Sequence, residues 1–150
     1  MSVNAIKDLV HRLYSEMLHD PFSAEKFIGP DYIDHNSEQD GRGPDVFRAH
    51  LAALRHTFPD LSVKIEDIIV EGDKVVTRVS GSGTHAGTWM DIEATGSVIQ
   101  LKGINIDRVV DGYIVEHWGE ADTVGMLMQM GVDPFAGREP VAASVSDQRQ

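Results

Sequence analysis

The chain has 150 residues, of which 24 are acidic and 13 are lysine or arginine, so its formal charge is −11. This length suits one domain with its own core. An apolar share of 41% excludes collagen, coiled coils and wholesale disorder. The excess of carboxylates disfavours nucleic acid and anionic membrane surfaces as partners, because both attract clustered lysine and arginine. The absence of cysteine removes thiol nucleophiles, disulfides and cysteine-held metal sites.

The first twenty residues mix charged and apolar side chains. They do not resemble a secretory signal, which carries an uninterrupted apolar run. No run of the sequence approaches the ~20 apolar residues of a membrane-spanning helix. We therefore expect a cytoplasmic protein without a membrane partner.

Two helices are predicted in the first part of the chain. Apolar residues recur at three- and four-residue steps over residues 3–17, which predicts an amphipathic helix with Ser2 as its cap. This helix should end before Pro21, because proline disfavours helical backbone in the residue that precedes it. A short extended piece is predicted over 31–36. Pro44 then opens a second helix, since proline suits the first helical turn, and Pro59 closes it.

Beyond residue 60 the pattern changes to that of strands. Tight turns are predicted at Glu71-Gly72-Asp73 and at Asp111-Gly112. We expect four strands, over 61–70, 74–85, 96–110 and 113–120, and a short helix over 123–130 that ends at Gly131. Helices followed by an antiparallel meander predict an α+β fold, in which a curved sheet wraps helices and leaves a pocket for a ligand.

The last part of the chain differs in composition. Residues 132–150 are rich in proline, alanine, serine and glutamine and show no apolar period. We therefore predict one domain over 1–131 and a flexible C-terminal tail over 132–150.

The last predicted strand carries the strongest functional signal. Because alternate residues of a strand share a face, the following side chains should lie together: Ile114, Glu116, Trp118, Glu120 and Asp122. A carboxylate beside a tryptophan in a closed cavity has a raised pKa, which suits a general acid or base that acts next to a carbonyl. The alternation equally allows a solvated face on which Trp118 only packs.

Arg108 and several histidines complete the set of candidate residues. Arg108 could hold an anionic ligand, but we expect it to pair with Glu116, because a lone buried carboxylate is costly. His35, His85 and His117 lie in or at the ends of extended segments, where each could act as acid, base or oriented donor, or could close a barrel rim by bonding a backbone carbonyl. No spacing enforces a metal site. The histidines of the predicted helices are interpreted as solvated or structurally satisfied: His11, His19, His50 and His56.

Short motifs follow one another in a recognisable order: Asp34-His35, Phe58-Pro59-Asp60, Gly83-Thr84-His85-x-Gly87, Gly103–Arg108, Asp111-Gly112, Ile114-x-Glu116-x-Trp118, Asp122 and Gln129-x-Gly131. Their order and spacing resemble those of the SnoaL-like polyketide cyclases, or ester cyclases, over about residues 3–131. The resemblance implies the cone-shaped α+β barrel of the wider NTF2-like superfamily and a homodimer or homotetramer. It also implies that Asp122 is the catalytic acid/base of an intramolecular aldol condensation, which needs no metal or cofactor. The substrate-binding residues would be His35, His85, Arg108, Glu116 and Trp118.

The leading hypothesis is therefore a cofactor-independent enzyme that cyclises a polyketide-like ester or another small hydrophobic carbonyl compound. An isomerase or an epoxide or ester hydrolase could use the same carboxylate. A protein that binds a small hydrophobic ligand without catalysis is the alternative from another class, and it predicts an ion-paired or exposed Asp122. Catalysis instead predicts that Asp122 and Trp118 line one enclosed cavity, with His35, His85 or Arg108 across from them.

Overall fold

Helix α1, Val3–His19, opens the chain in the computed structural model, which describes residues 1–37 and 40–137. The hydroxyl of Ser2 caps this helix by accepting a hydrogen bond from the amide of Ala5 at 3.1 Å. The predicted apolar stripe is buried against the rest of the molecule: Ile6, Leu9, Val10 and Leu13. The helix and its cap are thus confirmed.

The remaining elements follow in the expected order. They are α2 (Pro21–Ala24), η1 (Glu25–Phe27), β1 (Ile28–Asp34), α3 (Pro44–Thr57), β2 (Ser62–Glu71), β3 (Lys74–Thr84), β4 (Val98–Val110), β5 (Tyr113–Ala121) and α4 (Thr123–Gln129). Strand β1 begins three residues before the extended piece that was expected there, and the predicted tail lies outside the described residues from residue 138 onward.

The five strands form one mixed sheet in the order β1-β5-β4-β3-β2. Strands β2 to β5 pair as an antiparallel meander, and β1 adds to β5 in parallel. The predicted α+β architecture of helices on a mainly antiparallel sheet is confirmed. The sheet is an open, curved one rather than a closed barrel, because β1 and β2 remain its two edges.

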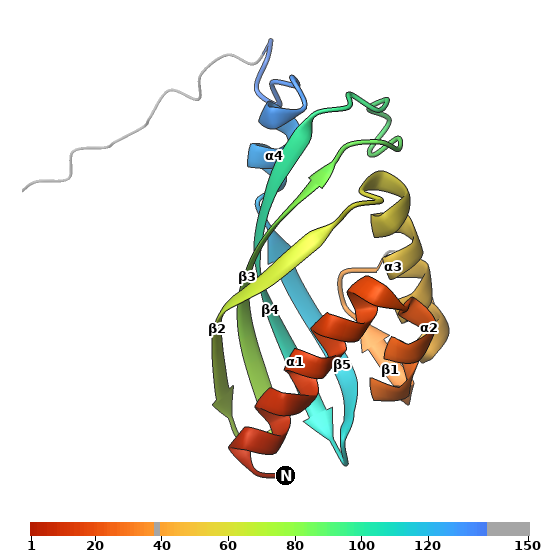
Figure 1. Ribbon diagram of the computed structural model, residues 1–150, viewed down its shortest axis with the longest axis vertical. Helices are drawn as coiled ribbons and strands as arrows, with labels where there is room; N and C mark the ends of the chain where they lie inside the picture. The colour runs from red at the N-terminus through yellow and green to blue at the C-terminus, as the bar shows by residue number, and fades with distance from the viewer. Residues whose placement is uncertain (38–39, 138–150) are drawn as a thin grey trace, which may run out of the picture.

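Helices α1, α2 and α3 lie on one face of this sheet (Figure 1). The main core fills the space between the two layers and includes Val10, Leu51, Val75 and Ile114. Full burial of one such side chain is worth about 1.5–3 kcal/mol, so this interface holds the helices on the sheet. In the described part of the chain, no helix is long and apolar enough to cross a membrane.

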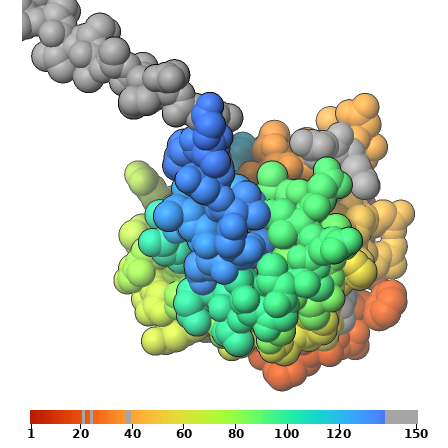
Figure 2. Space-filling view, turned by 90° about the horizontal axis from the view of Figure 1, so that it is seen from above, coloured from red at the N-terminus to blue at the C-terminus, as the bar shows by residue number. Residues whose placement is uncertain are grey.

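A second, smaller core lies at the end of the molecule that Figure 2 views, where α4 and the connection between β3 and β4 lie next to each other. Its buried members are Phe58, Ile99, Met126 and Met130. Gln129 ties α4 to β4, since its Oε1 accepts from the amide of Gln100 at 2.7 Å and its Nε2 donates to the carbonyl of the same residue at 3.0 Å.

Helices α1, α2 and α3 leave the other face of the sheet uncovered, and α4 lies beside the beginning of β4 at one end of the molecule (Figure 1). Apolar side chains of β4 and β5 are exposed on this uncovered face: Val98, Ile104, Ile106, Val110 and Tyr113. Polar residues of β4, Gln100, Lys102 and Arg108, lie between these apolar ones along the strand.

Candidate active site

A β-bulge in β5 decides which side chains of the last strand face the helices. Arg108 pairs with Glu116, whereas the next residue of β4, Val109, pairs with Ile114. Val115 is therefore an extra residue in β5 without a partner of its own. Such an extra residue interrupts the alternation of side chains along a strand.

After the bulge, each side chain of β5 lies on the face opposite to the one that strict alternation from Ile114 predicts. His117 lines the same cavity as Ile114, although the two are three residues apart. Trp118 pairs with Ile106, so its side chain lies on the face without helices. The prediction that alternate residues from Ile114 to Asp122 share one face is therefore wrong.

The cavity has a volume of about 170 Å³ and lies between α1, α3 and the inner face of the sheet. Its walls are mainly apolar and include Leu13, Phe47 and Leu54. The polar side chains that reach it include Tyr14, His50, Asn105, Asp107 and His117. Among the described residues that line it there is no lysine or arginine. Because no fixed cation would offset a negative ligand, the cavity suits a neutral one.

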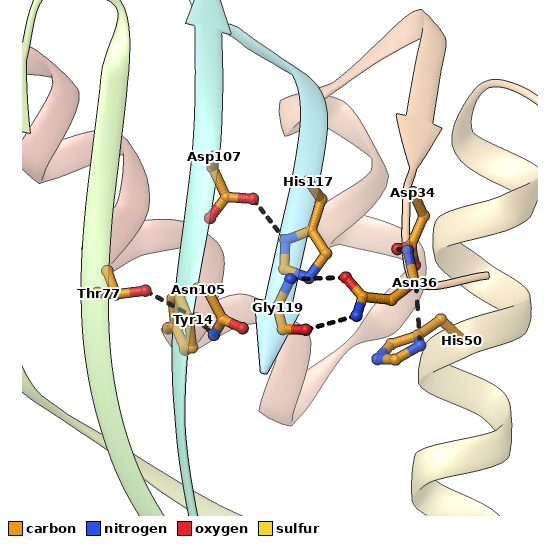
Figure 3. Close-up of polar contacts among 9 residues, drawn as sticks. All are labelled: Tyr14, Asp34, Asn36, His50, Thr77, Asn105, Asp107, His117 and Gly119. Carbon is orange, nitrogen blue, oxygen red and sulfur yellow. Dashed lines mark hydrogen bonds and ion pairs between the residues drawn. The ribbon is translucent and has the colours of Figure 1, made fainter. Parts of the chain in front are cut away.

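His117 and Asp107 form a hydrogen-bonded pair on the sheet (Figure 3), with 2.7 Å between Nδ1 and Oδ1. Burial alone would lower the pKa of His117, but the hydrogen bond and charge of Asp107, together with the charge of Asp34, raise it overall. Nδ1 is engaged, and Nε2 has no hydrogen-bond partner among residues 1–37 and 40–137. Gly119 leaves it accessible, since a Cβ on that residue would lie 3.0 Å from Nε2.

His50 and Asp34 form a second histidine–carboxylate pair, contributed by α3 and by the end of β1 (Figure 3). Nδ1 of His50 lies 3.9 Å from Oδ2 of Asp34, and the imidazole is 54% exposed whereas the carboxylate is 2% exposed. Partial burial and the charge of His117 lower the pKa of His50, and the opposing effect of Asp34 does not cancel them. The interpretation of His50 as a solvated or structurally satisfied helix histidine agrees with its exposure and with its contact with Asp34, but it did not include a place in the lining of the cavity.

Tyr14 brings a hydroxyl to the cavity from α1. This hydroxyl accepts a hydrogen bond from Nδ2 of Asn105 at 2.7 Å and lies 3.3 Å from Oγ1 of the buried Thr77. Burial is the main cause of a raised pKa for Tyr14. The phenol therefore keeps its proton and is a neutral hydrogen-bond donor beside the cavity.

Asn36 fixes the position of β1 against the part of β5 that carries His117. Its Oδ1 accepts from the amide of Gly119 at 2.6 Å, and its Nδ2 donates to the carbonyl of the same residue (Figure 3). The amide of His35 donates to the carbonyl of His117 at 2.9 Å, and Asp34 pairs with His117 in the ladder. The backbones that carry the two pairs are thus locked together.

Four of the residues predicted for the site meet on the opposite face of the sheet. Nε of Arg108 donates to Oε1 of Glu116 at 2.8 Å, as expected for this pair. Nε2 of His35 lies 2.9 Å from Oε2 of Glu116, and the ring of His35 stacks on Trp118 with 4.7 Å between centroids. Hydrogen bonds from His35 and Arg108 lower the pKa of Glu116. This cluster is therefore an ion-paired surface outside the cavity.

Asp122 and His85 lie in neither group. Oδ1 of Asp122 caps α4 by accepting from the amide of Gly125 at 3.0 Å, while Oδ2 lies 3.6 Å from Nζ of Lys102 and the side chain is 41% exposed. His85 is buried, and its Nδ1 accepts from the amide of Thr95 at 3.3 Å and lies 3.0 Å from its hydroxyl. Neither side chain lines the cavity. The exposed Asp122 beside Lys102 is the geometry that the non-catalytic alternative predicts, and the cavity shared by Asp122 and Trp118 that catalysis by Asp122 predicts is not found among the described residues. Nε2 of His85 is buried without a hydrogen-bond partner among the described residues.

The chemistry available in the cavity is proton transfer. Two imidazoles, each beside a buried carboxylate, face an apolar space together with a neutral phenol. Within residues 1–37 and 40–137, no three histidine, aspartate or glutamate side chains gather as a metal site would require. Such an arrangement can add a proton to one atom of a bound molecule and remove one from another.

Comparisons with known proteins agree on one family. The family model described as SnoaL-like polyketide cyclase matches residues 8–130. Aklanonic acid methyl ester cyclase DauD from Streptomyces sp. strain C5 is 30% identical over 112 residues, which cover 73% of this chain and 68% of the relative. Nogalonic acid methyl ester cyclase from Streptomyces nogalater is 28% identical over 119 residues, which cover 77% and 87%. The structure of TsrD from Streptomyces laurentii superposes with a TM-score of 0.80 at 30% identity, over 87% of this chain and 98% of TsrD. The chain therefore belongs to the SnoaL-like polyketide cyclases, the family that its motifs resemble.

Proposed function

We propose that this protein closes a ring in a neutral, largely apolar carbonyl ester by intramolecular aldol condensation. The observation that carries the proposal is the hydrogen-bonded His117–Asp107 pair in a mainly apolar cavity. The names of the curated relatives, cyclases of aklanonic and nogalonic acid methyl esters, support an ester as the substrate. The carbanion formed in such a reaction is delocalised over neighbouring carbonyls, so the step needs no cofactor.

The reaction forms one carbon–carbon bond and moves one proton from carbon to oxygen. The carbon between two carbonyls loses a proton, and the resulting enolate attacks a second carbonyl carbon, whose oxygen becomes a hydroxyl. His117, with its raised pKa, donates the proton to this oxygen through Nε2. The phenol of Tyr14, which keeps its own proton, donates a hydrogen bond to the enolate oxygen.

In this proposal His117 takes the proton-transfer role that the family motif implied for Asp122. The reason is position: His117 faces the apolar space in which a carbonyl compound would lie, whereas Asp122 caps a helix and faces solvent and Lys102. The resemblance implied substrate contacts for four residues that lie outside the cavity: His35, Arg108, Glu116 and Trp118. In this proposal the apolar walls of the cavity and Tyr14 contact the substrate instead.

Incubation with aklanonic acid methyl ester and, separately, with nogalonic acid methyl ester tests the proposal. We expect a product of unchanged mass with a different retention time and absorption spectrum, because ring closure that stops at the aldol hydroxyl, without loss of water, is an isomerisation. The matched control is His117→Gln, which keeps a polar side chain of similar size. Recovery of both esters unchanged, or equal conversion by the variant, would contradict the proposal.

The size of the cavity favours a second candidate, proton shuttling on a smaller carbonyl compound. Its volume of about 170 Å³ lies below the ~300–1,000 Å³ of sites for drug-sized ligands. An isomerase of this kind would accelerate the exchange of the acidic hydrogens of methyl acetoacetate for deuterium above the rate in enzyme-free heavy water. Accelerated exchange of this small ester, without conversion of either polyketide ester, would favour the second candidate.

We further propose that a second copy of the chain covers the exposed apolar face of β4 and β5. Ile104 is 50% exposed at the centre of this face and does not line the cavity. We expect light scattering to give at least twice the chain mass of 16.5 kDa, and Ile104→Lys to give the monomer, because a buried lysine without a partner is costly. Val3→Lys, at an equally exposed apolar residue of α1, should leave the assembly intact. A monomeric wild type would contradict this proposal.

A further inference from the structure

Ring closure requires a base at the carbon as well as an acid at the oxygen. His117 supplies the acid in the function proposed above, and the inference that follows rests on that function. A second imidazole, that of His50, lines the same cavity from α3, on the helical side. Its position raises the question of whether the two histidines act on different atoms of one substrate.

We propose that His50, oriented by Asp34, is the base that removes the proton from the acidic carbon of the substrate. Oδ1 of Asp34 accepts from the amide of Asn36 at 2.9 Å, which leaves Oδ2 directed to Nδ1 of His50 at 3.9 Å. A proton on Nδ1 would face this carboxylate, so Nε2 carries the lone pair that accepts the carbon proton. The buried carboxylate then stabilises the positive charge that the ring acquires.

The environments of the two histidines support this division of roles. Burial and the charge of His117 lower the pKa of His50, whereas Asp107 and Asp34 raise that of His117. Between the two pKa values His50 is neutral and His117 is charged. These are the forms that a base and an acid must have at the start of a turnover. The titratable groups whose charges act on His50 are Asp34 of β1 and His117 of β5. Tyr14 of α1, Tyr32 of β1 and Asp107 of β4 line the same cavity.

The proposed step balances without a further reactant. Nε2 of His50 takes a proton from the carbon, the enolate carbon forms the new bond, and the electron pair of the attacked carbonyl moves to its oxygen. That oxygen takes a proton from Nε2 of His117. His50 ends charged and His117 neutral. His50 is 54% exposed, so it returns its proton to water, and His117 regains one before the next turnover.

Deuterium exchange separates the two histidines, because removal of the carbon proton is measurable without ring closure. Aklanonic acid methyl ester is incubated in heavy water with the wild type, His50→Gln or His117→Gln, and initial rates of deuterium uptake into the ester and of cyclisation are both measured. The rate of uptake in enzyme-free buffer is subtracted, because hydrogens between two carbonyls also exchange without a catalyst. We expect His50→Gln to lose exchange and closure about 10²–10⁴-fold. His117→Gln should lose closure by a similar factor and retain exchange. His56→Gln, an exposed histidine on the same helix, is the matched control and should behave as the wild type.

The outcomes distinguish this inference from the function on which it rests. Exchange that survives in His50→Gln would overturn the assignment of His50 as the base, while loss of closure in His117→Gln would leave the proposed function standing. If the wild type neither exchanges nor cyclises the ester, the proposed function itself fails. A thermal unfolding midpoint of His50→Gln close to that of the wild type is expected, because the side chain is half exposed.

Discussion

Replacement of His117 by glutamine is expected to lower kcat for cyclisation of the test ester about 10²–10⁴-fold, the usual contribution of one positioned acid or base. The loss corresponds to about 3–5 kcal/mol of transition-state stabilisation. Glutamine cannot donate a proton to the developing alkoxide, whereas the apolar walls that bind the ester remain. KM should therefore change little, and initial rates over a range of ester concentrations separate the two constants.

Two further variants make this result specific to Nε2 of His117. Gly119→Ala leaves the imidazole in place but adds a methyl group 3.0 Å from Nε2 and 2.7 Å from Oδ1 of Asn105, so it should also reduce kcat. Asp122→Asn keeps a helix cap, because asparagine caps about as well as aspartate, and should retain activity near that of the wild type. If Asp122→Asn were inactive while His117→Gln remained active, the carboxylate of Asp122 and not the imidazole of His117 would be the catalytic group.

The sequence was sufficient for most of the fold, because local signals and the packed structure agree. Pro44 and Pro59 bound a helix, and the two turns before Lys74 and Tyr113 fix a meander of antiparallel strands. The parallel addition of β1 to β5 was not predictable in this way. It depends on contacts between residues about 80 positions apart, such as those of Asn36 with Gly119.

The site was harder to predict because a single extra residue in β5 moves the side chains that follow it to the opposite face of the sheet. Strict alternation grouped Ile114 with Trp118, whereas the bulge at Val115 groups it with His117. No composition signal marks Val115, since valine is also the residue expected in a regular strand. Four of the predicted residues did come together, but as an ion-paired cluster on the face of the sheet opposite the cavity: His35, Arg108, Glu116 and Trp118. The other two, Asp122 and His85, lie apart from this cluster and from the cavity.

In strand β4 the pattern of apolar residues also does not identify the face that lies toward the cavity. In the middle of the strand, the apolar residues Ile104 and Ile106 face away from the helices, while Asn105 and Asp107 face the cavity. This inversion is expected if the outer face is covered by another subunit and the inner face serves chemistry. One signal could have identified the strand residues of the cavity. Asn105 and Asp107 are two positions apart and therefore share a face, and Asp107 pairs with His117 of the next strand.

Replacement of Asp107 by asparagine should produce the second large effect, a fall in kcat of about 10²–10⁴-fold with a shifted pH profile. In Ser-His-Asp enzymes the corresponding change costs about 10⁴-fold, because the imidazole loses the carboxylate that orients it and stabilises its charge. Here burial would then dominate and lower the pKa of His117. The alkaline limb of kcat, on which the acid loses its proton, should therefore move to lower pH.

Asp107→Asn should also change how the free energy of unfolding depends on pH, because the pKa of His117 differs between the folded and unfolded states. The pKa of His117 in the folded protein is raised above its unfolded value, which is about 6.5. The stabilisation of the folded protein by the charged His117 is therefore complete when the pH lies below the pKa of the unfolded state. It is lost as the pH rises through the pKa of the folded state. The difference in free energy of unfolding between wild type and Asp107→Asn should thus be larger at about pH 6 than at about pH 9. Asp67→Asn, which removes an exposed carboxylate paired with Arg78, is the control and should show no such trend. A difference that grows with pH would mean that Asp107 does not stabilise a charged His117.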